Sequence, residues 1–450
     1  MESFKLDLNI PAKVRQISSS ILAEGKRVPS LTNSIVRSIE LVLARQGSAG
    51  ASLGTFKDVQ KQLGLGRPAC HEVIGILLAR GLVRVKNGRS GGLFVVSPAL
   101  DEAVGPILMY LAVNGAMAEC ISEFRLIVWR MVVETMFRRP DYSLFWLENA
   151  GEMGFAVNLA AALDNRVIEV AARLSELLVR VCGGKPAPAH DGELAESIAA
   201  RDPARVLRRI EEIAAQTNVA AFDLGSAVER GLVWRGRKSA MLLATRIGHD
   251  VAINKAAFES ERETAERLNC DSSVVRQARR ILQDFGVVSF RQGKKGDLGP
   301  KPAGSAGVIR LLAPHFASSS MHENSEVAEY MANEAAMLAV RRIQADSSLA
   351  SKIFVSVRSD VAFKDLIDSE NLMLEISGNP LLGIFVRSLA LAACSSHWLG
   401  KPPDMLEANR SIFHSFESGD ELSTRHLMQA KAKTLKWSIQ ASARDGTPNI

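Results

Sequence analysis

One short stretch of the sequence fits a pattern of covalent catalysis. Residues 88–92 read Gly-Arg-Ser-Gly-Gly, the Gly-x-Ser-x-Gly pattern of a hydrolase nucleophile elbow. That elbow needs a strand before the serine and a helix after it, whereas residues 93–96 read Leu-Phe-Val-Val, which is β-type sequence. The sequence contains no other nucleophile motif, metal-ligand cluster or phosphate-binding loop, so we expect no catalytic residue, no cofactor and no enzymatic activity.

A second set of residues has the chemistry of nucleic-acid recognition. Arg67 stands at the start of a predicted helix, where an arginine can donate two hydrogen bonds to guanine in the major groove or bind a phosphate, and both roles stay open. His71 lies one helical turn further on, and would add a weaker, pH-dependent contact or simply be exposed. These two side chains are the first DNA-binding candidates.

The elements that would position Arg67 follow from hydrophobic spacing. A helical period begins at Ile35, a second short helix runs from Thr55 to Leu63, and a third begins at Arg67 and ends at Gly81. Two apolar strands, 82–85 and 93–96, then flank a glycine-rich turn. This order predicts a winged helix-turn-helix.

The same pattern recurs at a constant offset of 205 residues. Gly81-Leu82-Val83 recurs as Gly286-Val287-Val288, and Leu77 falls on Leu282 in the same register. The period is too long for a solenoid and indicates duplication of a whole unit. In the second copy, Ser272 takes the place of Arg67 and Arg276 that of His71, followed by Arg280. The turns carry Arg89 and Ser90 in one copy and Lys294 and Lys295 in the other, which suit phosphate or minor-groove contact.

The positive charge of the chain is concentrated in these two segments. The formal net charge is +6, and residues 31–97 contain nine Lys/Arg against three Asp/Glu. Residues 232–301 also carry a basic excess, so the rest of the chain is acidic. A basic excess confined to two segments is typical of nucleic-acid modules, although scattered solvated charge is the alternative.

The residues around Arg67 resemble the signature of the GntR superfamily of bacterial transcriptional regulators. Residues 50–67, GASLGTFKDVQKQLGLGR, resemble its pattern G-x-x-L-P-S-E-R-x-L-A-x-x-L-G-V-S-R. In the second copy, residues 259–265, Glu-Ser-Glu-Arg-Glu-Thr-Ala, resemble the P-S-E-R-x-L-A segment, and residues 275–278, Val-Arg-Gln-Ala, resemble V-R-E-A. The resemblance implies that the third helix of each copy enters the major groove of double-stranded DNA.

The segments that follow resemble the helical sensor of the FadR-like branch of that superfamily. Residues 374–382 resemble its A-x-x-S-G-N-P-L-L break, and residues 407–420 resemble its E-H-x-x-I-x-x-A-I-x-x-G-D hairpin. Weaker counterparts lie at 163–165 and 193–202, and Ser122-Glu123-Phe124-Arg125 resembles the opening E-V-R. The resemblance covers about residues 33–440.

Many sensors of this branch are understood to hold a divalent metal through an aspartate and three histidines. The resemblance places these positions on or near Glu152, Ala156, Asp191 and Ile213 in the first copy, and on Leu366, Glu370, Asn409 and Lys431 in the second. None is histidine, so we expect no metal. Arg125 and Glu370 are weak candidates for binding a small organic-acid effector, and a structural ion pair is the alternative role of Arg125.

We therefore expect a mainly α fold, with two winged helix-turn-helix domains, each followed by an all-helical FadR C-terminal-type (FCD) sensor, and small β-hairpin wings. The predicted domains are 31–97, 98–222, 232–301 and 305–442. The two copies would pair within one chain as a pseudo-dimer, with a homodimer of chains also open. The two winged helix-turn-helix domains differ in the residues that would enter the major groove. The favoured operator would therefore be asymmetric.

A second function stays open: a degenerate regulator-like protein that acts through a protein partner instead of specific DNA. Weakened groove residues favour that alternative, and the two basic segments oppose it. The apolar windows are too short or interrupted to span a bilayer, and the five cysteines form no C-x-x-C pair. We expect a cytoplasmic protein without a membrane partner.

Overall fold

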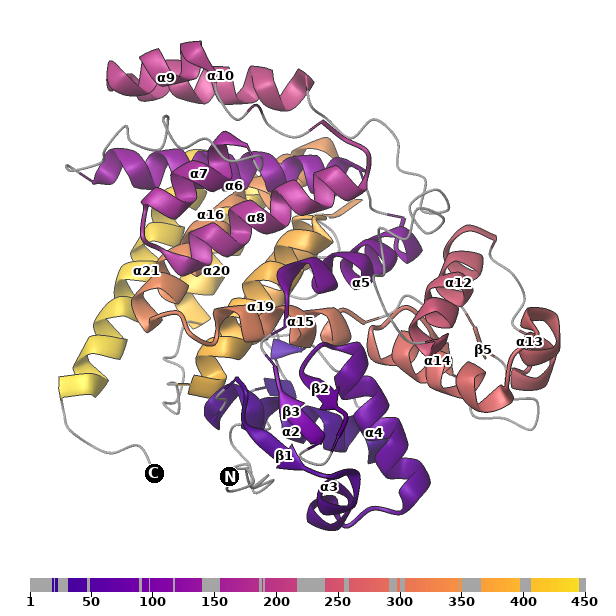
Figure 1. Cartoon of the computed structure of the whole chain (residues 1–450). Helices are drawn as coiled ribbons and strands as arrows, with labels where there is room; N and C mark the ends of the chain where they lie inside the picture. Colours follow the sequence, from indigo (N-terminus) through magenta and orange to yellow (C-terminus); the bar gives the residue numbers. More distant parts are fainter. Residues whose placement is uncertain are drawn as a thin grey trace.

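The computed structural model describes residues 18–19, 21–22, 31–46, 49–88, 91–96, 98–115, 118–139, 154–185, 188, 191–216, 239–254, 259–290, 298–299, 304–346, 348–349, 366–396 and 406–444. The chain is mainly helical with a small three-stranded antiparallel sheet, which confirms the mainly α prediction at that level (Figure 1). No helix among these residues is long and apolar enough to cross a membrane. The predicted wing residues Arg89, Ser90, Lys294 and Lys295 lie outside the described residues.

The first compact part, which we name the first head, combines three helices and the sheet. Its elements are α2 (Leu31–Gln46), β1 (Ser52–Gly54), α3 (Phe56–Leu63), α4 (Arg67–Ala79), β2 (Val83–Lys86) and β3 (Gly92–Val95). The strands lie in the order β1-β3-β2, with Val83 opposite Val95 and Lys86 opposite Gly92. Ile39, Val59 and Val73 are almost fully buried, so each helix turns one apolar stripe inward.

The first helical unit follows directly. It consists of α5 (Leu100–Val113), α6 (Ala118–Arg138), α7 (Phe155–Ala162), α8 (Arg166–Val181), α9 (Gly192–Ala199) and α10 (Pro203–Gln216). Helix α10 packs on α6 and α9 at the top of Figure 1. Its apolar residues Val206, Ile210 and Ile213 are buried, whereas its arginines face outward, as expected of an amphipathic surface helix.

The second half presents a similar order of elements. The second head contains α12 (Ser239–Asn254), α13 (Glu261–Leu268), α14 (Ser272–Asp284), β4 (Ser289–Phe290) and β5 (Leu298–Gly299). The second helical unit contains α15 (Ala306–Leu312), the 3-10 helix η2 (Ala313–Phe316), α16 (Met321–Ala345), α18 (Leu366–Ile376), α19 (Pro380–Ser396), α20 (Leu406–Ser418) and α21 (Glu421–Arg444). Helices α3 and α13, and likewise α4 and α14, begin and end at the offset of 205 residues.

The two copies also use matching helix caps. Thr55 begins α3 and Ser260 begins α13, each with a capping box that satisfies first-turn N–H groups. Helix α3 ends at Gly64 and α13 at Asn269, both with left-handed backbones (φ 62° and 47°), a conformation that glycine and asparagine adopt at least cost. Local sequence chemistry therefore sets the same helix ends in both halves.

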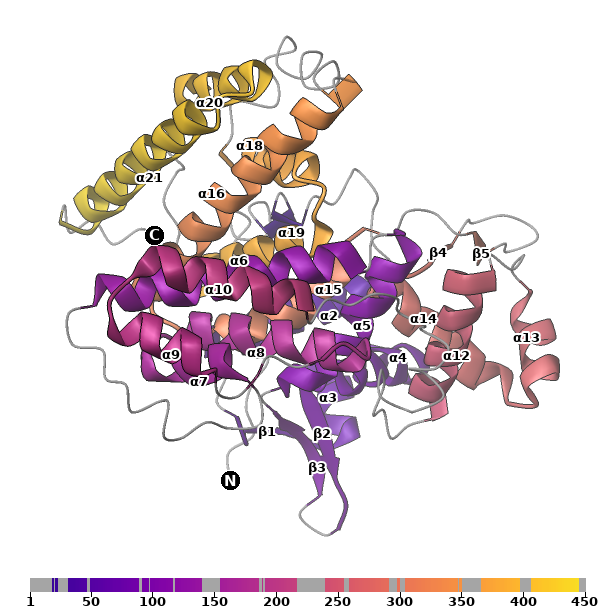
Figure 2. The same cartoon turned by 90° about the horizontal axis from the view of Figure 1, so that it is seen from above.

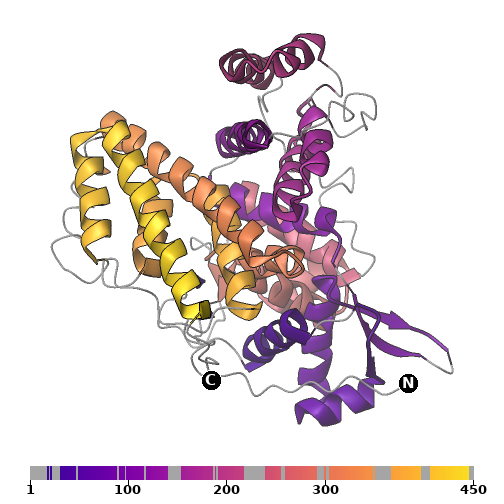
Figure 3. The ribbon, with the colours of Figure 1, turned by 90° about the vertical axis from the view of Figure 1, so that its left-hand side faces the viewer.

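The two halves pack against each other throughout the molecule. Helices α12 and α14 lie beside α5 and α4 (Figures 1 and 2), and helices α16 to α21 group on one side of the molecule in Figure 3. Phe124 of α6 packs against Phe385 of α19, with ring centroids 5.5 Å apart, and the ring centroid of Phe316 lies 5.2 Å from that of Phe385. Buried apolar residues of both halves belong to one cluster.

Asn379 links the helical units by hydrogen bonds. Its side-chain oxygen caps α19 by accepting from the N–H groups of Leu381 and Leu382, both at 3.1 Å. Its amide nitrogen donates across the chain to the Cys120 carbonyl (3.1 Å) and to Glu123 Oε2 (3.0 Å). Asn165 caps α8 in the same way but reaches only one residue of the other half, Glu326, at 3.3 Å.

Replacing Asn379 by alanine should therefore destabilise the fold more than the same change at Asn165. We expect a loss of about 2–4 kcal/mol for Asn379→Ala and about 1–2 kcal/mol for Asn165→Ala, because the first also removes two hydrogen bonds to α6, at the Cys120 carbonyl and the Glu123 carboxylate. Urea unfolding followed by circular dichroism measures both. Equal losses would show that Asn379 acts only as a helix cap.

Candidate nucleic-acid interface

The start of α4 is an open, positively polarised helix end. Arg67 and His71 are both exposed, as a reading helix requires. The N-cap residue is Gly66, which has no side chain that could accept a hydrogen bond from the first turn. That turn also contains no acidic residue. Its backbone N–H groups and the helix dipole thus favour an anion such as a phosphate.

The neighbouring residues of the first head define the setting of these side chains. The His71 ring stacks on Phe56 of α3, with centroids 4.2 Å apart and an interplanar angle of 31°. Arg67 makes no hydrogen bond or ion pair with any described residue, so its five N–H donors remain available. The remaining exposed charges on α3 and β2 are mostly basic: Lys57, Lys61, Arg84 and Lys86 against Asp58.

Asp58 has a structural role that accounts for its presence on this surface. Its carboxylate accepts from the N–H and the hydroxyl of Thr55, both at 2.7 Å. These hydrogen bonds hold the pKa of Asp58 below its usual value. The carboxylate is therefore engaged at the start of α3, and the basic residues outnumber it on this face.

The second head has a different surface. Residues 259–285 contain five arginines and six acidic residues. The exposed arginines are paired locally: Arg276 Nε lies 3.1 Å from Glu261, Arg262 Nε lies 2.8 Å from Glu266, and Arg267 Nε lies 2.7 Å from Glu259. Much of the basic excess of 232–301 belongs to residues 235–238, 255, 291–295 and 301, which lie outside the described residues.

The start of α14 also differs from that of α4. Ser272 is exposed, and Asp271 caps the helix by accepting from the Ser273 N–H at 2.7 Å. Hydrogen bonds from Ser273 hold the pKa of Asp271 below its usual value, so a negative charge occupies this helix end. Such a charge opposes the approach of a phosphate.

The last two arginines of α14 point in different directions. Arg279 is only 4% exposed and donates to Thr264 Oγ1 (2.9 Å) and to the Glu259 carbonyl, which ties α14 to α13. Burial lowers its pKa. Arg280 is half-buried and donates to Gln283 Oε1 at 3.1 Å. Of the predicted pair, Arg276 is therefore the more accessible.

Helices α4 and α14 lie side by side along their C-terminal halves. Arg80, which follows α4, donates from Nε to Asp284 Oδ2 of α14 at 2.6 Å. Five residues earlier on α4 and seven earlier on α14 there is no space between the helices, since a Cβ on Gly75 would lie 2.2 Å from Gln277 Nε2. Both helices therefore run in the same sense from their free starts, which diverge in Figure 1.

The separation of the two helix starts has an upper limit. Arg67 lies eight residues before Gly75 and Ser272 five before Gln277, which at 1.5 Å per residue gives about 12 and 8 Å of helix. With roughly 8 Å between the helix axes at the contact, the starts lie within about 28 Å of each other.

The effector candidate Arg125 is occupied within the protein. Its guanidinium forms two hydrogen bonds of 2.9 Å to the carboxylate of Glu176, and both side chains are at most 3% exposed. Trp129 Nε1 donates to the same carboxylate at 3.0 Å, and the guanidinium carbon lies 4.3 Å from the centre of a Trp129 ring. This arrangement is the structural ion pair that the sequence left as the alternative.

Glu370 lies in the second helical unit, on a different element from Arg125. Its carboxylate is 3.6 Å from the ammonium of Lys431, which is only 6% exposed. Burial lowers the pKa of Lys431, and Glu370 opposes that shift. Asn409 is also buried, and its Nδ2 has no hydrogen-bond partner among the described residues.

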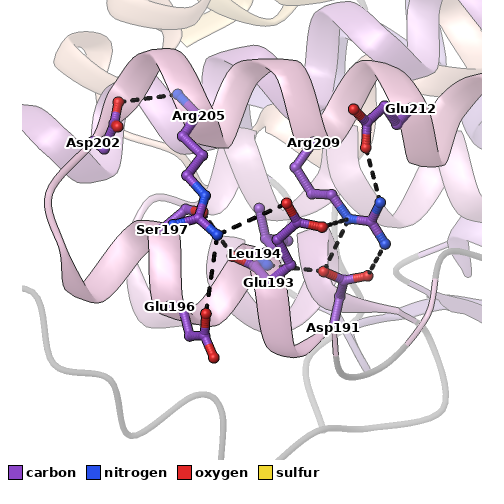
Figure 4. Close-up of polar contacts among 9 residues, drawn as sticks. All are labelled: Asp191, Glu193, Leu194, Glu196, Ser197, Asp202, Arg205, Arg209 and Glu212. Carbon is purple, nitrogen blue, oxygen red and sulfur yellow. Dashed lines mark hydrogen bonds and ion pairs between the residues drawn. The ribbon is translucent and has the colours of Figure 1, made fainter.

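In the first helical unit, Asp191 has a structural role (Figure 4). It caps α9 by accepting from the Leu194 N–H at 2.8 Å and pairs with Arg209 Nη2 of α10 at 2.8 Å. Glu212 also accepts from Arg209, at 2.8 Å. These bonds close the α9–α10 hairpin and occupy the Asp191 carboxylate. In the part of the chain that the structure describes, His, Cys, Asp and Glu form no group that could hold a metal ion.

Comparison with known proteins adds no further evidence, because no family model, curated protein or solved structure matches the chain.

Sequence reasoning missed the partners of several charged residues. Glu261 lies fifteen residues before Arg276, on the neighbouring helix, and its pairing depends on how α13 packs against α14. A local signal did exist for Arg310, which interrupts the apolar run Val308–Leu312. A charge inside such a run indicates a buried partner.

If Arg125 is structural, removing it should destabilise the fold. We expect Arg125→Met to cost about 3–5 kcal/mol, because it leaves the buried Glu176 carboxylate unpaired. The matched control is Arg173→Met, since Arg173 pairs with Glu169 at 3.1 Å on the surface and is 48% exposed. That change should cost less than about 0.5 kcal/mol. Thermal unfolding measures both, and equal small losses would reopen an effector role for Arg125.

Proposed function

We propose that the chain is a DNA-binding transcriptional regulator that contains two GntR/FadR-like protomers in one polypeptide. Each would combine a winged helix-turn-helix head with an FCD-type helical sensor. The observation that carries the proposal is the exposed, unpaired Arg67 at the open start of α4, with basic neighbours on α3 and β2. The element order of the first head supports it, since helix α2, strand β1, helices α3 and α4 and the β2–β3 hairpin follow the order of a winged helix.

The operator would be short and asymmetric. Reading helices that occupy successive major grooves on one face of DNA lie roughly 34 Å apart. The starts of α4 and α14 lie closer, within about 28 Å by helix geometry. The two heads would therefore read adjoining base pairs instead of half-sites separated by a full turn.

The first head would supply most of the affinity. Arg67 has free donors, whereas Arg276 must first leave Glu261, and Asp271 places a negative charge at the start of α14. Breaking an exposed ion pair costs little, but the remaining carboxylate repels the phosphate backbone. The second head would thus contribute less to binding and more to orientation.

A carboxylate-bearing small molecule is the proposed effector. Lys431 offers a buried ammonium that pairs with Glu370, and Asn409 offers an amide donor without a partner among the described residues. Both groups favour an anion with several oxygen acceptors. The Lys431 ammonium would also repel a metal cation, which agrees with the expected absence of a metal ligand set.

A protein partner is the second candidate function, and the paired arginines of the second head favour it. A surface whose cations are neutralised by Glu259, Glu261 and Glu266 suits a protein better than DNA. A mobility-shift assay on the DNA upstream of the protein's own gene, with scrambled competitor, distinguishes the two. Failure of the wild-type chain to prefer that DNA would favour the protein partner.

The two heads should respond unequally to loss of their arginines. We expect Arg67→Ala to reduce binding by about 1–3 kcal/mol, because it removes a groove or phosphate contact with no internal substitute. Arg276→Ala should cost under about 1 kcal/mol, since it also removes an ion pair to Glu261. Fluorescence anisotropy on a fixed operator fragment measures both, with the surface change Arg173→Ala as control.

The opposite ranking would contradict this assignment. A larger loss for Arg276→Ala would place the main reading function in the second head, despite its acidic surroundings. Footprinting of each variant adds the position of the lost contact, which should lie at opposite ends of the site.

A further inference from the structure

Four charged side chains meet in the interior where the heads join the second helical unit. They are Glu40 of α2, Arg80 at the end of α4, Asp284 at the end of α14 and Arg310 of α15. Their side chains are 7%, 0%, 1% and 6% exposed. Charged groups reach such depth only when paired.

The four groups form a closed ring of ion pairs. Arg80 contacts Asp284 through Nε (2.6 Å) and Glu40 through Nη1 (2.8 Å). Arg310 contacts the same two carboxylates, Glu40 through Nε (3.0 Å) and Asp284 through Nη2 (2.9 Å). The two guanidinium and two carboxylate groups balance in formal charge. Burial raises the pKa of Glu40, and Arg80, Arg310 and the neighbouring Arg37 of α2 oppose that shift.

Three of the four links cross between parts of the fold, and the fourth, Arg80–Glu40, lies within the first head. The Arg80–Asp284 link joins the ends of α4 and α14, hence the first head to the second. Arg310 joins both heads to α15, the first helix of the second helical unit. Backbone contact is close at this point, since a Cβ on Gly307 of α15 would lie 1.6 Å from the Asp284 carbonyl oxygen.

Directional bonds control an angle better than apolar contacts do. The planar guanidinium groups of Arg80 and Arg310 each donate a hydrogen bond to the Asp284 carboxylate, whereas their contacts with Glu40 are ion pairs without hydrogen-bond geometry. Apolar packing, the Arg80 guanidinium over the Phe285 ring and Gln277 against Gly75 also hold α4 beside α14, but these contacts are less directional. A buried ion-pair cluster often adds little stability over apolar residues of similar size, and in some proteins it instead selects one geometry.

We propose that Glu40, Arg80, Asp284 and Arg310 are positioning residues that fix the angle between α4 and α14. Arg80–Asp284 is the direct link, and Glu40 with Arg310 anchors it to α2 and α15. On the proposed function, this ring sets the spacing of the two DNA segments that the protein accepts, although none of its side chains reaches the surface.

The test compares two charge-balanced double variants of the full chain. Arg80→Met with Asp284→Leu removes the direct link between the heads and leaves Glu40 paired with Arg310. Glu40→Gln with Arg310→Met removes the same number of charges and keeps Arg80 paired with Asp284. Neither leaves an uncompensated buried charge, so both are expected to fold.

The readout is the distance between the heads in the absence of DNA. Spin labels are attached through ketone-bearing non-natural residues at Lys61 of α3 and Arg262 of α13, which are both exposed. This chemistry avoids the cysteines. Pulsed electron paramagnetic resonance then gives the distribution of distances between the labels.

We expect the Arg80→Met/Asp284→Leu distribution to broaden about twofold, because the heads then sample several relative orientations. The Glu40→Gln/Arg310→Met distribution should keep the wild-type width. Equal widths in all three proteins would overturn the proposal and assign the angle to apolar packing. If circular dichroism shows the first variant to be unfolded, Arg80→Lys replaces it, because a lysine cannot bridge two carboxylates as a fork does.

A selection experiment with DNA distinguishes a failure of this inference from a failure of the proposed function. Selection from a library with variable spacing between two segments should give one preferred spacing for the wild type and for the matched control. The Arg80→Met/Asp284→Leu chain should accept several spacings. If the wild type selects no DNA, the proposed function fails, while the label distances still decide whether the ring positions the heads.

Discussion

The arrangement of the molecule depends on the burial of four charges at one junction. Glu40, Arg80, Asp284 and Arg310 come from both heads and from α15, and none of them could stay ionised in the interior if its partners moved away. The ends of α4 and α14 must therefore meet. The exposed starts of both helices then lie on one side of the molecule, at a separation that helix length limits.

The two halves share their internal chemistry and differ at their surfaces. Thr55 and Ser260 form the same capping box, and Asn165 and Asn379 cap equivalent helices through the same pair of backbone bonds. These residues maintain helix ends, and a change there affects the whole unit. Arg67 and Ser272 occupy matching exposed positions, at which neither side chain caps a helix. The helix caps are therefore alike in the two halves, whereas the exposed residues at the starts of α4 and α14 differ.

The features of the fold that could be predicted from the sequence are those that local residue patterns determine. Period and turn residues indicated the helices that begin near Thr55 and Arg67 and the strands of 82–85 and 93–96, and a mainly α fold is confirmed. Local patterns could not show that Arg279 is buried against Thr264, or that Arg80 meets Asp284 across 204 residues. Such contacts depend on tertiary packing, which overrides the expectation that arginines are exposed. The reading roles of Arg67, His71 and Arg276 stay predictions.

The ring of charges also bears on why two copies lie in one chain. At the offset of 205 residues, the counterparts of Glu40, Arg80, Asp284 and Arg310 are Thr245, Phe285, Ala79 and Gly105, none of which is charged. A symmetric pair of identical protomers would need every contact twice, with both partners in each copy. Neither half carries all four residues, so two identical copies of either half could not close this ring. The ring requires two different halves, and fusion in one polypeptide allows each half to change without the other. The same freedom permits the exposed surfaces of the two heads to differ, and on the proposed function that difference would make the DNA site asymmetric.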